Sequence, residues 1–247
     1  MTWKPDRPVS SGATAYHDAI VNASWHIAGG SSTAFLDEMD KLGIILKQQL
    51  KPGISAGRRQ SYEETSKLPG VDIICSTEAE KYSLVHDCLH ILLQPFTHDT
   101  ADIVMAKRTP ESFETYPENQ RKYEKKGNKL LNDILRQHDL LPANAEDLDF
   151  WFGPKLFKNT PEIVNLFLQK YNFRRLDRKL DQKVNPESWP DALFFPIVLA
   201  LHEKKRIVSV DIPHTHPPEQ TASEQDSEEH RKKEMNNIKI FFYLLFI

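Results

Sequence analysis

Residues 71–81 read VDIICSTEAEK, a short apolar run followed at once by polar residues. Short apolar runs are typical of buried strands in α/β proteins, which bind ligands beyond the carboxyl ends of their strands. Glu78 and Glu80 are therefore placed where a metal or a phosphate would be bound. A structural alternative also fits, because Thr77 and Glu80 have the spacing of a capping box that would begin the next helix.

The rest of the chain alternates predicted strands with predicted helices. Apolar runs predict the strands, whereas apolar residues at helical spacing and capping residues predict the helices. The predicted strands are 44–46, 71–75, 101–105 and 207–212, and the predicted helices are 16–27, 34–42, 60–67, 78–93, 117–137, 160–171 and 191–201. This alternation favours an α/β fold with a mixed, mostly parallel sheet flanked by helices.

Composition narrows the class of protein. The 247 residues are 39% hydrophobic, enough for a core, and the net charge of −3 argues against nonspecific nucleic-acid binding. Cys75 and Cys88 lie in apolar segments, which suggests reduced thiols and a cytoplasmic location. The chain opens without a signal-peptide pattern, and we expect no transmembrane span, because the apolar end (238–247) is too short to cross a bilayer.

Three regions are expected along the chain. Prolines and a Ser-Ser-Gly run predict an irregular arm over residues 1–15. One α/β domain is expected over 16–218. Residues 219–247 are expected to form a charged tail with an apolar end, which is either a closing strand or a truncated terminus.

The sequence PGISAGRR (52–59) combines a glycine turn with two arginines. Backbone amides of the turn at Gly53 and the planar guanidinium groups of Arg58 and Arg59 would suit a diphosphate. The alternative is that both arginines face solvent at the entry to a helix. Lys81 presents the same choice between binding a phosphate and being a solvated lysine in the first turn of a helix.

Seven segments, taken in order, resemble the nucleotide-sugar-dependent glycosyltransferases of the GT-A, family-2-like type. They are GGSST (29–33), PGISAGRRQ (52–60), STEAEK (76–81), ADIVMAKR (101–108), FETYPENQRKYEKKGN (113–128), DLDFWFGPKLF (147–157) and SVDIPHTHPPEQ (209–220). The resemblance extends over roughly residues 16–235. It implies a GT-A-like, Rossmann-like fold and transfer of a sugar from a nucleotide-diphosphate donor to an acceptor.

The resemblance also implies a divalent metal, Mg²⁺ or Mn²⁺, as cofactor. In that family an Asp-x-Asp after a strand binds the metal and the diphosphate, and Glu78 and Glu80 match it with longer hard-oxygen ligands. His214 and His216 resemble the histidine that completes such a metal site. Because glutamate reaches further than aspartate, metal dependence stays open, and Lys81 could take over part of the metal's charge. The donor-binding residues implied are Gly53, Arg58, Arg59, Lys81 and Arg108.

Asp147 and Asp149 resemble the acceptor side of such enzymes. A carboxylate there deprotonates the attacking hydroxyl and must lie within hydrogen-bond reach of it. The alternative is that Asp147 caps a turn and Asp149 is a surface acid. The neighbouring Trp151 and Phe152 could stack on a sugar or belong to the core.

Two other functions stay open. His86, His90 and His98 resemble ligands of an HD-type metal phosphohydrolase, although they flank an apolar helix face rather than join it. A non-catalytic relative, which keeps the fold as a binding or interaction module, would explain the glutamates in place of aspartates. It would also explain why no strong apolar strand precedes Tyr16 and why Gly30 stands where an acid is expected.

Overall fold

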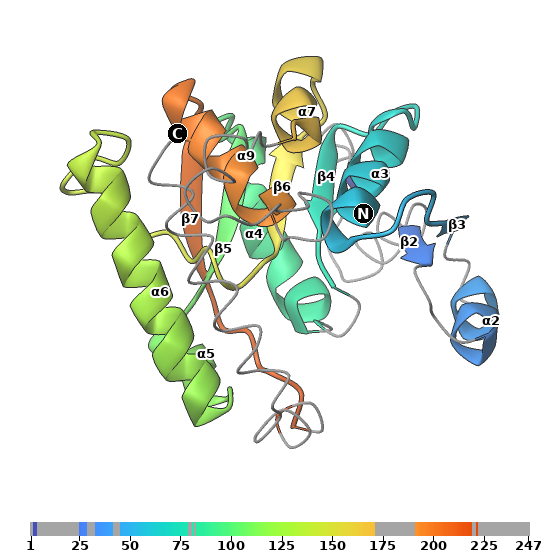
Figure 1. Cartoon of the computed structure of the whole chain (residues 1–247), viewed down its shortest axis with the longest axis horizontal. Helices are drawn as coiled ribbons and strands as arrows, with labels where there is room; N and C mark the ends of the chain where they lie inside the picture. The colour runs from blue at the N-terminus through green and yellow to red at the C-terminus, as the bar shows by residue number, and fades with distance from the viewer. Residues whose placement is uncertain are drawn as a thin grey trace, which may run out of the picture. The chain divides into compact units, whose positions relative to one another are not determined.

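The computed structural model describes residues 2–3, 25–28, 33–41, 45–78, 81, 83–170, 191–218 and 221. Figure 1 shows the helices and strands of the described residues. The chain forms two compact units. Unit 1 is Met1–Ser76 with Leu156–Leu199, and unit 2 is Thr77–Lys155 with Ala200–Ile247. The domain predicted over 16–218 is therefore divided between both units.

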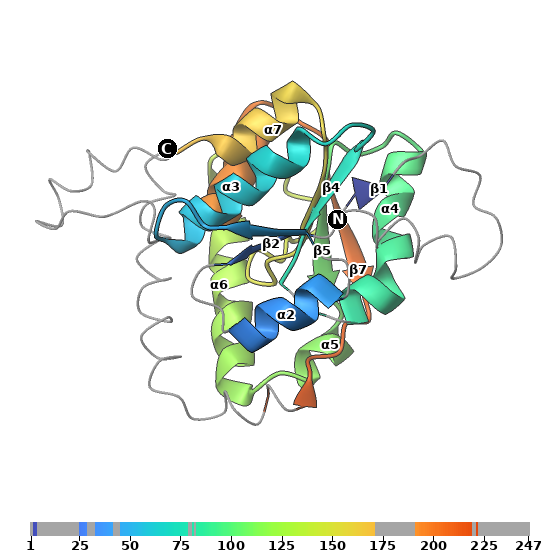
Figure 2. The same cartoon turned by 90° about the vertical axis from the view of Figure 1, so that its right-hand side faces the viewer.

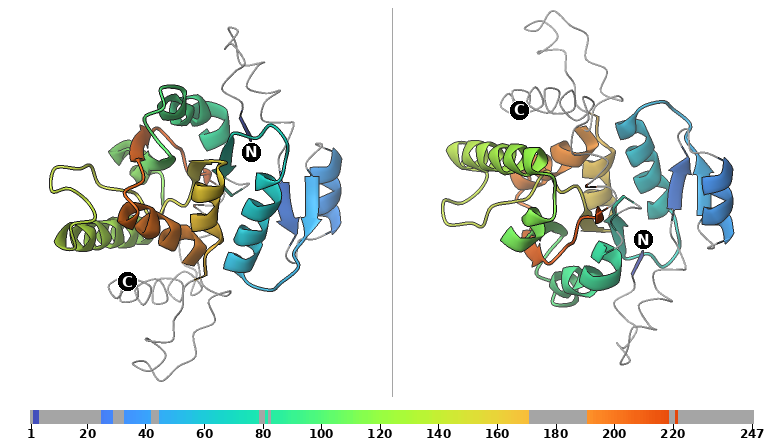
Figure 3. Two further views of the ribbon diagram at one scale, coloured as in Figure 1. Left: turned by 90° about the horizontal axis from the view of Figure 1, so that it is seen from above. Right: turned by 90° about the horizontal axis from the view of Figure 1, so that it is seen from below.

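Unit 1 combines short strands with helices. Its described elements are β1 (Thr2–Trp3), β2 (Trp25–Ala28), α2 (Thr33–Lys41), β3 (Ile45–Gln48), α3 (Ile54–Ser66), β4 (Ile73–Ser76), α7 (Pro161–Leu168), most of β6 (Lys155–Lys158) and most of α9 (Asp191–His202). β1 pairs antiparallel with β4, and β2 pairs parallel with β3. The β2–β3 pair lies between α3 and α2 (Figure 3).

Unit 2 is built on a parallel strand pair. Its elements are a π-helical turn η1 (Leu84–Cys88), α4 (Leu89–Thr97), β5 (Ile103–Arg108), α5 (Pro110–Glu114), α6 (Glu118–Gln137) and β7 (Ile207–Ile212). β5 and β7 pair in register from Ile103 opposite Ile207 to Arg108 opposite Ile212, and α4 packs on both (Figure 2). Both strands therefore end at one edge.

Local chemistry explains where several helices begin. Thr109 accepts a hydrogen bond from the Ser112 amide (3.2 Å) and is followed by Pro110 at the first position of α5. Thr160 precedes Pro161 in the same way at the start of α7. Both are N-caps followed by a proline whose missing N–H is not needed there. The α/β class and the predicted strand at 207–212 are confirmed.

The predicted helix over 16–27 is wrong at its end. Residues 25–28 form β2, because parallel pairing with β3 outweighs the local helical spacing, and residues 16–24 lie outside the described residues. The arm predicted over 1–15 includes β1, and its other residues are not described. Of the predicted tail over 219–247, only Thr221 is described.

In the two motifs predicted to bind phosphate, 52–59 and 76–81, the helices begin at other residues than predicted. α3 begins at Ile54, directly after Gly53, whose φ of 113° is a conformation that glycine adopts readily. Because the helix begins there, Arg58 and Arg59 lie within it. The helix predicted from residue 78 begins as η1 at Leu84. Thr77 is therefore not its cap, and its hydroxyl lies toward the Glu78 carbonyl (3.3 Å).

An aromatic cluster forms the core of unit 1. The rings of Phe157 and Phe167 stack at 3.8 Å, and the ring of Tyr62 meets each of them edge-on at 5.5 Å. The Tyr62 hydroxyl also lies 3.1 Å from the Ser76 hydroxyl. The cluster therefore fixes α3 against the end of β4.

The two cysteines are free and buried. Burial raises the pKa of the Cys75 thiol and of the Cys88 thiol to about 11, so neither is an activated nucleophile. None of the helices in the described ranges combines the length and the apolar character that a membrane span requires.

Phe167→Ala is expected to lower the free energy of unfolding by about 3–5 kcal/mol, because it leaves a cavity beside a stacked ring. The matched control is Leu50→Ala, whose side chain is 78% exposed and whose loss should change stability by less than about 0.5 kcal/mol. Urea unfolding followed by circular dichroism measures both. Equal effects of the two substitutions would contradict the stacked core.

Candidate functional site

Charged side chains gather in unit 2 where β5 and β7 end. Arg108 is the last residue of β5, and His214 and His216 follow β7. All three are buried, with exposed fractions of 2%, 1% and 5%. Because the two strands are parallel and in register, these residues share one edge of the strand pair.

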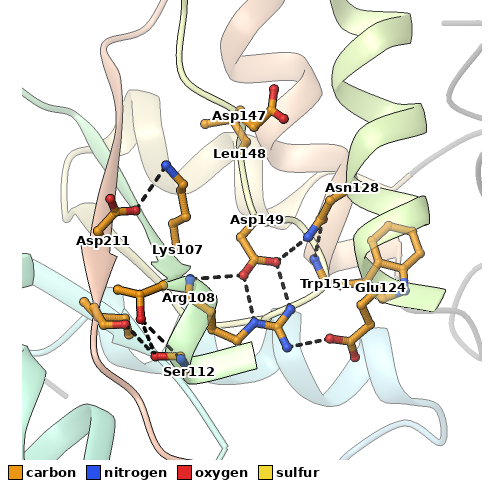
Figure 4. Close-up of polar contacts among 12 residues, drawn as sticks. Lys107, Arg108, Ser112, Glu124, Asn128, Asp147, Leu148, Asp149, Trp151 and Asp211 are labelled. Atoms are coloured by element: carbon orange, nitrogen blue, oxygen red, sulfur yellow. Dashed lines mark hydrogen bonds and ion pairs between the residues drawn. The ribbon is translucent and has the colours of Figure 1, made fainter. Parts of the chain in front are cut away.

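Arg108 is the centre of a buried ion cluster, the Arg108 cluster, made with Glu124, Asn128 and Asp149 (Figure 4). Its Nε and Nη2 donate to the two carboxylate oxygens of Asp149 at 2.8 and 2.9 Å. Its Nη1 donates to Glu124 at 2.5 Å, and Asn128 Nδ2 donates to Asp149 at 2.6 Å. Both oxygens of Asp149 therefore accept hydrogen bonds within the protein.

Aromatic rings enclose the Arg108 guanidinium. Its central carbon lies 4.1 Å from the ring centre of Phe113, 4.8 Å from that of Tyr116 and 5.0 Å from that of Phe152. Such contacts are favourable for a desolvated cation. Burial alone would lower the pKa of Arg108, but Glu124 and Asp149 raise it above its ordinary value, so the charge stays in place.

The pKa values of the two acids in the Arg108 cluster are shifted in opposite directions. Burial raises the pKa of Glu124, and this effect exceeds the opposing effect of Arg108. Burial would also raise the pKa of Asp149, but the charge of Arg108 and hydrogen bonds from Arg108 and Asn128 hold it below its ordinary value. Asp149 is therefore the firm partner of Arg108, because it makes the bidentate contact.

One face of α6 fastens the loop that carries the predicted catalytic acids. Asn132 donates to the Leu148 carbonyl and accepts from the Leu148 amide, both at 2.9 Å. Arg136 donates to the Ala145 carbonyl at 2.8 Å. Glu124, Asn128, Asn132 and Arg136 are spaced by four residues, so they lie along one face of the helix. This spacing of four residues is the sequence signal from which the contacts between α6 and the loop could have been predicted.

The predicted catalytic acids occupy different environments. Asp149 is 5% exposed and belongs to the Arg108 cluster. The Asp147 side chain is 55% exposed and pairs with Arg136 at 2.7 Å. Asp147 therefore keeps access to solvent, whereas Asp149 does not.

A second group of residues, the His214 cluster, joins three segments that are distant in sequence. Lys81 Nζ lies 3.0 Å from Glu78 Oε2 and 5.7 Å from the ring centre of Phe152. The Phe152 ring in turn lies 4.9 Å from the His214 ring. The Lys81 side chain is only 16% exposed. Residues Glu78 and Lys81, Phe152 and His214 are thus brought together by the fold.

His214 is held in a single orientation. Its Nδ1 lies 2.8 Å from the Ser83 hydroxyl, which also accepts from the Thr215 amide at 3.2 Å. Its Nε2 is buried and has no hydrogen-bond partner among the described residues. Burial, followed by the charges of Lys81, Arg108 and His216, lowers the pKa of His214 to about 3. The imidazole is therefore neutral at ordinary pH.

His216 has its own partners. Its Nδ1 lies 2.7 Å from the Thr221 hydroxyl, and its amide donates to the Thr115 hydroxyl at 2.9 Å. The Tyr116 ring lies 4.2 Å from the His216 ring and 6.2 Å from the His214 ring. The two histidines therefore lie on the same tyrosine but bind different hydroxyl groups.

Gly153 makes room for the Glu78 carboxylate. Its φ is 95°, and a Cβ at this position would lie 3.4 Å from both carboxylate oxygens. Lys155, which is 2% exposed, donates from Nζ to the Gly153 carbonyl at 2.9 Å. Lys155, although it lies in the segment 147–157, and Ser83 were not predicted, because nothing in the neighbouring sequence marks either residue as a partner in this site.

The described residues do not fit a divalent-metal centre. No three histidine, cysteine or acidic side chains within the described ranges form a group that could hold a metal ion. Glu80 lies outside those ranges. Beside Glu78, where the resemblance implies the metal, the structure places the ammonium of Lys81.

Gly53, Arg58 and Arg59 belong to unit 1, and their role in binding the donor stays a prediction. His86 lies on an exposed surface and contacts Asp87 at 2.5 Å. His90 and His98 are also exposed, which gives the phosphohydrolase alternative no cluster among the described residues.

Comparisons with known proteins add one structural similarity. No protein-family model and no curated protein matches the chain. The chain is similar to the crystal structure of glucosyl-3-phosphoglycerate synthase from Mycobacterium tuberculosis in complex with Mn²⁺, uridine diphosphate and glucosyl-3-phosphoglycerate. The identity is 11% and the TM-score 0.49, and the match covers 84% of this chain and 66% of that one. A similarity of this size does not assign an activity.

Asp149→Asn and Glu124→Gln form a matched pair of isosteric substitutions. Asp149→Asn is expected to destabilise the protein by about 3–5 kcal/mol, because a buried Arg108 loses its bidentate partner. Glu124→Gln should cost less, about 1–3 kcal/mol, because Glu124 accepts one hydrogen bond from Arg108, whereas Asp149 accepts from both Nε and Nη2 of Arg108 and from Asn128. Urea unfolding at pH 7 measures both, and equal losses would contradict the assigned roles.

The same pair predicts a pH dependence. The folded pKa of Asp149 lies below its unfolded value of about 3.9, so its stabilising effect is present above about pH 4 and is lost as the pH falls through the folded pKa. The stability difference between wild type and Asp149→Asn should therefore shrink below about pH 4. A difference that stays constant with pH would refute the ion pair.

Asn132→Ala should release the loop over residues 145–151. Buried Leu148 would lose both partners of its peptide groups, which is expected to cost about 1–3 kcal/mol. Hydrogen exchange of these amides should accelerate more than that of β5. Lys129→Ala, on an exposed part of the same helix, is the control and should leave exchange unchanged.

Proposed function

We propose that this chain is a glycosyltransferase-like protein that binds a nucleotide-diphosphate sugar and transfers the sugar to an acceptor. The observation that carries the proposal is the His214 cluster. It joins residues from three of the segments on which the GT-A resemblance rests, 76–81, 147–157 and 209–220. Nothing local in the sequence would bring those segments together.

The chemistry of the His214 cluster suits the phosphate end of such a donor. Lys81 supplies a cation in a site that is largely withdrawn from water, where charge-assisted hydrogen bonds to phosphate are strong. Neutral His214 adds a polar atom without adding charge. Gly153 allows the backbone to approach the Glu78 carboxylate closely, because a side chain at this position would meet Glu78.

For the transfer step, we propose Asp147 as the general base rather than Asp149. A general base needs an oxygen that can reach the acceptor hydroxyl. Asp149 accepts hydrogen bonds on both oxygens from Arg108 and Asn128, whereas the Asp147 side chain is 55% exposed. Asp149 would then position the loop by holding it to Arg108.

A second candidate is a binding protein that recognises the same donor without turnover. The observation that favours it is the neutralisation of the acids in this region. Glu78 pairs with Lys81, Asp149 pairs with Arg108, and Asp147 pairs with Arg136. A protein of this kind would bind the nucleotide sugar and leave its glycosidic bond intact.

A screen of UDP-, GDP- and ADP-sugars tests both candidates. Ligand at about 100 times its Kd adds about 2.7 kcal/mol to the stability of the native state, which raises Tm by several degrees. The proposal expects such a rise with one nucleotide, together with slow release of the nucleoside diphosphate as sugar passes to water. Binding without release favours the second candidate, and no rise with any nucleotide sugar contradicts both.

Asp147→Asn is expected to abolish that release while the rise in Tm is kept, because only the base is lost. Glu146→Gln is the matched control, since Glu146 is an exposed neighbour that contacts Lys107. Chromatographic assay of the released nucleotide measures the effect. Unchanged release in Asp147→Asn would remove Asp147 from catalysis.

A further inference from the structure

A cation lies beside Glu78, one of the residues at which a divalent metal is implied. Lys81 Nζ lies 3.0 Å from the Glu78 carboxylate and faces the Phe152 ring. The same Phe152 ring lies 4.9 Å from the His214 ring. Glu78, one of the predicted metal ligands, is therefore paired with a lysine.

The geometry of Lys81 suits a bridge between the protein and a phosphate. An ammonium carries three N–H donors, so it can contact Glu78 and a phosphate oxygen at once, as a bound cation would. Glu78 is itself held against Gly153, which has no side chain to displace it. The carboxylate thus orients the ammonium.

A divalent cation would be disfavoured in the same place. It would lie beside the Lys81 ammonium, and like charges a few ångströms apart oppose each other. The residues described offer no group of three metal-ligating side chains to offset that repulsion.

We propose that Lys81, oriented by Glu78, neutralises the ligand's phosphate groups in place of a divalent metal, so that this protein binds its ligand without metal. The inference rests on the proposed function, because it takes the ligand to be a nucleotide diphosphate. It specifies that function further, since the resemblance alone implies Mg²⁺ or Mn²⁺.

Isothermal titration calorimetry of the full chain with UDP-, GDP- and ADP-sugars and with pyrophosphate tests the inference. The Kd of the ligand that binds should be the same within about twofold in EDTA and in Mn²⁺. Binding that requires Mn²⁺ overturns the inference and leaves the proposed function standing. Pyrophosphate binding without any nucleotide-sugar binding defeats the proposed function alone, and loss of both defeats the two together.

Substitutions of Lys81 separate its charge from its shape. Lys81→Met should weaken binding at least about tenfold, whereas Lys81→Arg, which keeps the charge, should restore most of the affinity. Lys126→Met is the matched control at an exposed lysine of α6 and should leave the Kd unchanged. Equal Kd values for wild type and Lys81→Met would overturn the role of Lys81.

A titration of the protein alone with Mn²⁺, followed by electron paramagnetic resonance, provides a readout without nucleotide. Wild type is expected to show no saturable binding below millimolar Mn²⁺. Saturable binding in that range would overturn the inference whatever the nucleotides do.

Discussion

The bidentate contact between Arg108 and Asp149 is the interaction on which the rest of unit 2 depends. A guanidinium and a carboxylate are both withdrawn from water, which is costly unless each satisfies the other. The contact connects the end of β5 to the loop before Gly153, and α6 holds that loop from its other side. This contact determines the position of Phe152. The Phe152 ring in turn contacts Lys81 and His214.

The Arg108 cluster and the His214 cluster distribute their charged groups differently. In the Arg108 cluster every charged group faces another group of the protein, and aromatic rings close over the cation. In the His214 cluster a lysine is kept partly accessible while a neutral imidazole stands beside it. The first arrangement fixes a loop, and the second leaves a polar atom and a cation at the strand ends. This difference is the reason for proposing a binding role for the His214 cluster and a structural role for the Arg108 cluster.

Much of the fold could be predicted because its signals are local. The apolar run at 207–212 and the N-cap at Thr160 need no distant partner, so the predicted elements match β7 and α7. The start of β2 could not be predicted, since it depends on pairing with β3. The burial of Asp149 was equally out of reach, because an aspartate between Leu148 and Phe150 gives no sign of the arginine it meets 41 residues away. The contact of Lys81 with Glu78 could be foreseen because the two residues are only three positions apart. The position of His214 depends instead on the pairing of β7 with β5, which is not visible in the local sequence.

The π-helical turn η1 places an extra residue between Ser83 and α4. A π-helical turn takes up more residues per turn than an α-helix, so Leu84–Cys88 contain about one residue more than an α-helical turn leading into α4 would contain. Ser83, at its start, meets His214 and Thr215 rather than the core. A relative with an uninterrupted α-helix here would align with this chain only across a gap within residues 84–88. The segment before η1 and helix α4 after it would then be separated by one residue more in this chain than in that relative.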